Sequence, residues 1–153
     1  MKHKQFLSKS LVSDKYIAES AECIEELREH FLEYKEELNF SPESLKIITS
    51  LIKKVIKKRD PFLALTEEVS LSDGEIWFIT RFSYYLAEVF IRNTNAKWSF
   101  DDNKKSKTFN HYVLVWDKSK EKYNPLTTVL AGSINHFDLY DHYLFLEKKI
   151  HQE

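Results

Sequence analysis

The fold is decided by the most apolar stretch of the chain, GEIWFITRFSYYLAEVFIRN, which spans residues 74–93. Ser72 or Asp73 can cap the start of a helix here, and the apolar pattern stops at about Asn93. Aromatic and aliphatic side chains would point to nearly every side of this helix. A helix that is apolar all round is buried at the centre of its domain. The stretch therefore predicts a central helix against which the rest of the chain packs.

Two amphipathic helices are expected before it, over residues 13–38 and 42–58. In the first, apolar residues recur in steps of three and four, which is the spacing of one helix face. In the second, Ser41 suits the N-cap and Pro42 the first helical position. Residues 1–12 show no such spacing and are expected to form a flexible N-terminal arm.

Beyond the central helix the pattern changes to that of strands. Lys97–Asp101 alternates in strand fashion and Phe109–Trp116 is rich in β-formers, so both are expected as antiparallel strands. Asp117–Lys122 is a charged turn that can lead into a short third strand. Pro125–Gly132 is expected to form one or two helical turns, and Asp138–His151 a helix. The fold class is therefore α+β, with three N-terminal helices, a small antiparallel sheet and a C-terminal helix.

Size and composition indicate one helix-rich domain, residues 13–153. The chain has 153 residues, 42% of them hydrophobic, and a formal net charge of -1. This charge gives no general attraction to nucleic acid or to an anionic membrane. No apolar run approaches the roughly 18 residues that span a bilayer, and none follows the first residues as a signal peptide requires. We expect a cytoplasmic protein with no nucleic-acid or membrane partner.

Charge is divided unevenly between the first two helices. Residues 14–38 hold nine acids and three bases, whereas residues 46–59 hold six bases and no acid. One interpretation is that the two helices complement each other across their edges. The other is that the acidic face binds a basic partner, for instance a nuclease whose phosphate-binding surface it would cover. The residues proposed for such contacts are Glu22, Glu26, Glu29 and Glu33, together with the aromatic and acidic group Trp98, Asp101 and Asp102.

The sequence contains no catalytic or metal-binding pattern. None of the six histidines lies at ligand spacing from another, and no nucleotide-binding loop, serine-hydrolase motif or zinc-protease motif is present. Cys23 lies among glutamates, which raise the pKa of a thiol and so disfavour its use as a nucleophile. The sequence therefore predicts a protein that is not an enzyme and that uses no cofactor or metal.

Charged residues interrupt the central helix, and Glu88 and Arg92 have the favourable i, i+4 order of an ion pair. A carboxylate in apolar surroundings must be paired, hydrogen-bonded or protonated. Glu88 can serve the structure by accepting hydrogen bonds from the following backbone or from the Trp98 indole. Alternatively, the charged residues line a pocket for a small molecule, with Tyr84 or Tyr85 and Trp98 as its walls. The pocket candidates are Arg81, Tyr85, Glu88 and Arg92.

The same helix carries a resemblance to known proteins. Tyr85-Leu86-Ala87-Glu88-Val89 followed by Trp98, and preceded by Ser41-x-Glu43-Ser44-Leu45, resembles uncharacterised bacterial domains with a Tyr-Leu-Gly-Glu-Val helix and a Gly-Gly-x-Trp strand. Some similar small α+β domains look like immunity proteins encoded beside secreted toxins. This chain departs from the pattern, because Ala87 stands where Gly is typical and Asn95-Ala96 replaces the Gly pair. The resemblance implies an inhibitor whose partner is a toxin.

Three functions are compatible with these patterns. The first is a non-enzymatic protein-interaction domain, most concretely an immunity-type inhibitor that blocks a cognate toxin. The second is a small-molecule-binding or regulatory domain with a pocket near Glu88 and Trp98. The third is a structural homodimer whose exposed aromatic side chains form the interface. The sequence leaves open whether the protein is a monomer or a homodimer.

Overall fold

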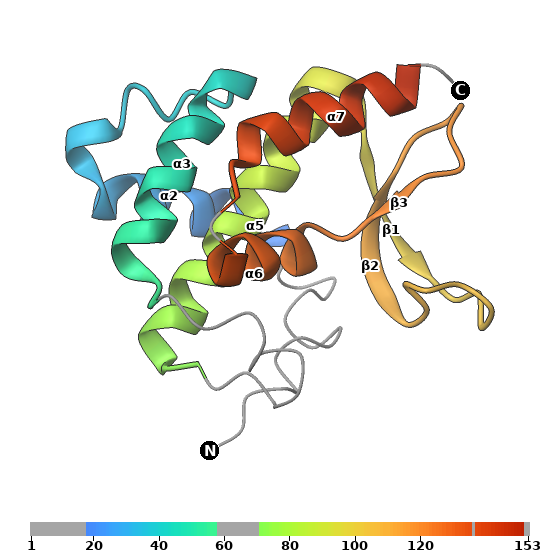
Figure 1. The fold of residues 1–153 in the computed structure, drawn as a ribbon, viewed down its shortest axis with the longest axis horizontal. Coiled ribbons are helices and arrows are strands. Elements are labelled where there is room, and N and C mark those ends of the chain that lie inside the picture. The colour runs from blue at the N-terminus through green and yellow to red at the C-terminus, as the bar shows by residue number, and fades with distance from the viewer. Residues whose placement is uncertain (1–17, 58–70, 136, 152–153) are drawn as a thin grey trace.

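A computed structural model describes residues 18–57, 71–135 and 137–151 of the chain (Figure 1). Helices make up most of it and a small sheet lies at one end, which confirms a helix-rich α+β fold. The expected N-terminal arm, residues 1–12, lies outside the described residues. In chain order the elements are α2 (Ser20–His30), the 3-10 helices η3 (Leu32–Tyr34) and η4 (Pro42–Ser44), α3 (Leu45–Val55), α5 (Asp73–Thr94), β1 (Lys97–Asp101), β2 (His111–Val115), β3 (Lys122–Tyr123), α6 (Pro125–Asn135) and α7 (Leu139–His151).

The central helix, α5, is confirmed. Ser72 Oγ accepts a hydrogen bond from Glu75 N, and the Glu75 carboxylate accepts one from Ser72 N. This reciprocal capping box satisfies two backbone groups that a helix start otherwise leaves without partners. Farther along, Phe82, Tyr85 and Phe90 are completely buried. α2, α3 and α6 pack against α5, so it forms the centre of the domain (Figure 1).

The first helix is shorter than expected. The apolar spacing predicted a helix to about Leu38, but α2 stops earlier, and Phe31 leaves helical geometry with φ -107° and ψ 54°. Phe31 turns into the core, where its ring stacks 6.3 Å from that of Phe82. The Arg28 guanidinium stabilises the new path by donating hydrogen bonds to the carbonyl groups of Lys35 and Leu38. The start of the predicted helix lies outside the described residues.

The second helix begins as expected and ends early. Ser41 Oγ accepts a hydrogen bond from Ser44 N, and Pro42 takes the first position of the 3-10 turn that leads into α3. The helix stops short of the expected Lys58, because Ile56 adopts an extended conformation with φ -104° and ψ 124°. The Ile56 side chain is buried there, so the chain turns inward at the point where a helix would have continued along the surface.

The sheet has three antiparallel strands in the order β1-β2-β3. β1 has the expected bounds, with Lys97 opposite Val115 and Asp101 opposite His111. β2 is shorter than the expected Phe109–Trp116 at both ends. At its start Asn110 has a positive φ of 70° that regular strand pairing does not allow, and at its end the pairing stops at Val115. The short third strand is present as β3.

One face of the sheet packs on the central helix. Trp98 lies edge-on to Tyr84 with ring centroids 6.3 Å apart, and the Tyr123 ring lies 4.9 Å from that of Phe90. Leu114 lies between Trp98 and Tyr123 in the sheet and is completely buried. The sheet is therefore joined to the helices through aromatic contacts.

The last two helices close the fold. α6 extends past the expected end at Gly132, and α7 lies along the side of the molecule that is uppermost in Figure 1. Thr49 Oγ1, on α3, accepts a hydrogen bond from Leu139 N at 3.0 Å and so fixes the start of α7. Tyr143 of the expected inward stripe is buried, whereas Ile150 is half-buried. In the part of the chain that the structure describes, every helix is too short or too polar to cross a membrane.

Candidate functional site

The acidic face of α2 and the start of α5 border an open hollow, here called the acidic hollow. Its lining residues are Glu22, Glu25, Glu26, Glu29 and His30 from α2, and Trp77 from α5. Three of the four acids proposed from the sequence are therefore brought together, because positions three and four apart share a helix face. The fourth, Glu33, is exposed on η3 and does not line the hollow, since α2 ends before it.

Aromatic rings lie beside these acids. The His30 ring is 5.6 Å from that of Trp77 and 5.0 Å from that of Phe78. The Arg81 guanidinium lies over the Trp77 ring, 4.0 Å from its centre, and donates a hydrogen bond to Glu26 at 3.2 Å. An aromatic face next to carboxylates favours a cation, both through the ring quadrupole and through charge-assisted hydrogen bonds.

Bases of the chain itself pair with part of this acidic face. The pairs are Arg28 with Glu25 at 2.9 Å, Lys35 with Glu25 at 3.2 Å, Lys35 with Glu29, and Arg81 with Glu26 at 3.2 Å. The hydrogen bonds from Arg28 and Lys35 lower the pKa of Glu25, so this carboxylate is ionised at neutral pH. Glu22 has no ion-pair partner within the described ranges.

Among the described residues, Lys53 and Lys54 at the end of α3 form no ion pair with the acids of α2, and Lys58 and Arg59 lie outside the described residues. Mutual complementation of the two helices predicts ion pairs between α2 and lysines such as Lys53 and Lys54. The bases that pair with the α2 acids come instead from α2 itself, from the turn after it and from α5. Four glutamates of α2 line the hollow and three described bases pair with them, so Glu22 is left without a paired base among the described residues.

The second proposed contact group separates into a buried and an exposed part. Asp101 is 4% exposed, and its carboxylate accepts hydrogen bonds from Thr108 Oγ1 at 2.5 Å and from Asn103 N at 3.1 Å. Burial raises the pKa of Asp101, but the hydrogen bonds outweigh burial and hold this pKa well below its usual range. Asp101 therefore fixes the connection between β1 and β2. Trp98 is half-buried, and Asp102 is exposed.

Two of the four pocket candidates contact Phe40, and a third pairs with one of these two. The Tyr85 ring stacks on the Phe40 ring at 5.0 Å, and the Arg92 guanidinium lies 3.9 Å from the centre of the same ring. Glu88 pairs with Arg92 at 2.8 Å, which confirms the i, i+4 ion pair. Phe40 thus contacts two of the side chains that were expected to line a cavity. Arg81 is directed instead to the acidic face of α2.

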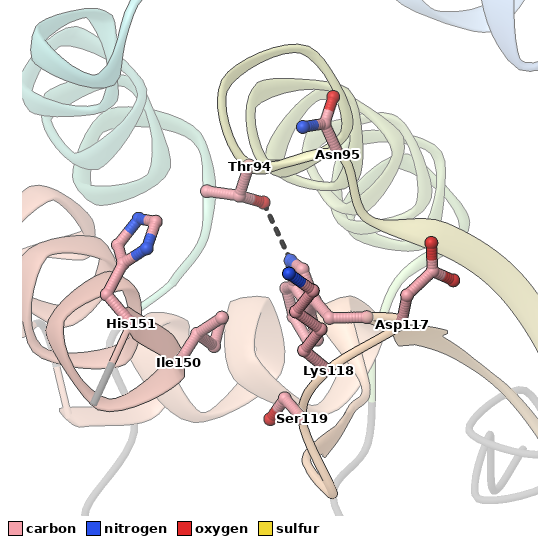
Figure 2. A pocket seen from close by; sticks show the side chains of 8 residues that line it. Thr94, Asn95, Asp117, Lys118, Ser119, Ile150 and His151 are labelled. Atoms are coloured by element: carbon pink, nitrogen blue, oxygen red, sulfur yellow. Dashed lines mark hydrogen bonds between the residues drawn. The ribbon is translucent and has the colours of Figure 1, made fainter. Parts of the chain in front are cut away.

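A more enclosed pocket, of about 310 Å³, lies where α5 and α7 end (Figure 2). Its lining residues are Thr94, Asn95, Trp116, Asp117, Lys118, Ser119, Ile150 and His151. Trp116 Nε1 donates a hydrogen bond to Thr94 Oγ1 at 2.8 Å along one side (Figure 2). Its volume lies at the lower end of small-molecule sites. Local sequence patterns do not predict this pocket, because three segments far apart in the chain form it.

Three residues of the acidic hollow were not proposed from the sequence. Glu25 and His30 could have been found, since helical spacing places them beside Glu22 and Glu26. Trp77 could not, because its approach to α2 depends on how two helices pack. The sequence therefore carried the charge of the hollow but not the contribution of Trp77 from α5.

The described residues also bear on metal binding and on thiol chemistry. Across residues 18–57, 71–135 and 137–151, no group of three or more histidine, cysteine, aspartate or glutamate side chains is placed to hold a metal ion. Cys23 is buried, and this burial raises the pKa of its thiol. Comparisons of the chain with protein-family models, with curated proteins and with solved structures give no match.

Proposed function

We propose that this chain is a non-enzymatic protein-interaction domain whose acidic hollow binds a basic protein partner. In its most concrete form it is an immunity-type inhibitor that blocks a toxin by covering a basic surface. The observation that carries the proposal is that four carboxylates line one open surface together with an aromatic pair, Trp77 and His30.

The chemistry of the hollow suits a lysine or arginine side chain of the partner. Such a side chain places its cation against a carboxylate while its aliphatic stem covers apolar surface. Arg81 already makes this arrangement within the chain, because its guanidinium lies over Trp77 and bonds to Glu26. An acidic surface also attracts a basic partner over long range and so increases the association rate.

Glu22 is the sharpest probe of this surface. The other three glutamates of the hollow each pair with a base of the chain, so their reversal would also disturb α2 and its contacts. Glu22 is exposed, lines the hollow and has no ion-pair partner in the ranges that the structure describes. Its replacement therefore changes the surface and leaves the described ion pairs intact.

We expect E22K to weaken binding to the product of the neighbouring open reading frame by at least about tenfold, the equivalent of about 1.4 kcal/mol. The physical reason is the replacement of an attraction by a repulsion at a basic interface. Titration calorimetry gives the affinity, and stopped-flow fluorescence gives the association rate, which should fall and depend less on salt.

The matched control is E37K, which makes the same charge change at an exposed glutamate outside the hollow. Its affinity should stay within about twofold of wild type, because a charge outside the interface acts mainly through screened long-range attraction. The absence of any complex would contradict the proposal. So would wild-type affinity in an E22K variant that keeps its thermal stability.

A further inference from the structure

The outer side of α7 is unlike its inner side. Leu139, Tyr143 and Leu146 face the core and are buried. The opposite stripe holds Asp141, Leu144, Phe145 and Lys148, all exposed, and we call it the α7 outer stripe. Leu144 is 42% exposed and Phe145 is 68% exposed, although they are adjacent and both are large and apolar.

The two charged residues of this stripe lie at equal distances on either side of its apolar centre and have opposite charges. Asp141 lies three residues before Leu144, and Lys148 lies three residues after Phe145. Residues at these spacings share one helix face. The stripe therefore has an acid at one end, two apolar side chains in the middle and a base at the other end.

A surface with opposite charges at equal distances from its centre is complementary to itself under a two-fold rotation. When a second α7 packs antiparallel, Leu144 and Phe145 of one copy meet those of the other. Asp141 then lies opposite Lys148 of the partner subunit, and the reverse pair forms at the other end. A two-fold interface has this property, because each contact occurs twice.

We propose that the α7 outer stripe is a self-association surface at which a second copy of this chain packs antiparallel. Two features of the molecule support it. α7 is held to the domain by the hydrogen bond to Thr49 and by its own buried side chains. Its backbone therefore needs no further ordering when a second copy binds to its outer side. The formal net charge of -1 gives little long-range repulsion between copies. The surface lies on a different element from the acidic hollow, so the proposal does not depend on the proposed function.

The first test measures self-association of the full chain by sedimentation equilibrium, from about 5 µM to about 500 µM. The range extends to high concentration because a single pair of helices forms a small interface and therefore a weak dimer. We expect a monomer–dimer equilibrium for wild type and a monomer throughout for F145E. The matched control is L32E, at another large apolar residue, 65% exposed on η3, which should associate as wild type does. Circular dichroism confirms that both variants are folded.

The second test exchanges the charges. D141K and K148D should each weaken the dimer by about fivefold or more, because each places like charges opposite one another. The double variant D141K/K148D should restore the affinity to within about twofold of wild type. The double variant places a base near the start of α7 and an acid near its end, and both charges interact unfavourably with the helix dipole. A recovery of the dimer affinity therefore cannot come from a more stable helix.

Three results would overturn the proposal. A wild-type chain that stays monomeric over the whole concentration range has no such interface. A folded F145E variant that dimerises as wild type does uses another surface. A double charge variant that remains as weak as the single variants shows that Asp141 and Lys148 do not meet.

Discussion

Single polar side chains hold together parts of this protein that are far apart in sequence. The Tyr85 hydroxyl, which is completely buried, lies 2.6 Å from Ser44 Oγ and accepts a hydrogen bond from Phe40 N at 3.1 Å. It thereby joins the central helix to the turn before α3. Burial raises the pKa of Tyr85, so the hydroxyl keeps its proton at neutral pH. Such hydrogen bonds matter because a buried polar group without a partner lowers the free energy of unfolding.

His142 lacks such a partner, and its protonation should therefore destabilise the fold. Its ring lies 5.6 Å from that of Tyr123 and 5.7 Å from that of Phe137, and its buried Nε2 has no hydrogen-bond partner among the described residues. Burial lowers the pKa of His142 below its ordinary value of 6.5. The unfolded chain therefore binds this proton more readily than the folded one, and stability falls as the pH decreases through about 6.5.

We expect H142F to reduce the loss of unfolding free energy between about pH 7 and pH 5, since phenylalanine keeps an aromatic ring in place and cannot take up a proton. Urea unfolding at several pH values measures this. H151F, on the same helix but at an exposed position, is the control and should behave as wild type does. If the unfolding free energy of H142F depends on pH as that of wild type does, protonation of His142 is not what destabilises the fold.

At the scale of elements, side chains determine where the helices begin and end. Arg28 donates to two carbonyl groups beyond the end of α2, and Ser41 caps the turn before α3. Glu75 serves two elements, because one carboxylate oxygen accepts from Ser72 N and the other accepts from Lys57 N at 3.0 Å. This carboxylate therefore joins the end of α3 to the start of α5.

We expect E75A to lower the free energy of unfolding by about 3 kcal/mol, because two backbone amides lose a charged acceptor. S72A removes only the hydrogen bond to Glu75 N and should cost about 1 kcal/mol. E75Q should fall between the two, since an amide has one acceptor oxygen in place of two. Urea unfolding monitored by circular dichroism ranks the three variants. A smaller effect for E75A than for S72A would show that the link to Lys57 contributes little.

At the scale of the whole molecule, the acidic hollow and the α7 outer stripe belong to separate elements. The hollow combines α2 with the start of α5, whereas the stripe lies on the helix that packs against α3. Neither surface shares a described hydrogen bond or ion pair with the other. Substitutions at sites that share no partners have effects that add.

The two proposed interactions should therefore be independent. We expect E22K to leave the self-association constant within about twofold of wild type, and F145E to leave the affinity for the basic partner within about twofold. Sedimentation equilibrium and titration calorimetry measure the two constants. A change of both constants in either variant would show that one surface serves both interactions.

Local sequence patterns determined much of this fold. The all-round apolar stretch at 74–93 specified the central helix, and the alternation at Lys97–Asp101 specified β1 to the residue. These predictions succeeded because capping residues and side-chain periodicity act over a few residues. The prediction that the first helix continues to Leu38 was wrong. The apolar residues keep their spacing of three and four beyond His30, so the spacing does not reveal that the helix ends at Phe31.

By itself, the sequence determined the order and type of the elements and the concentration of acids on the first helix. Only the tertiary structure decided which of these residues meet. It buried Asp101, directed Arg81 to Glu26 of α2, and brought Trp77 beside the acids of α2. The physical reason is range, since helix periodicity and caps depend on near neighbours, whereas a surface composed from two helices depends on how the whole core packs.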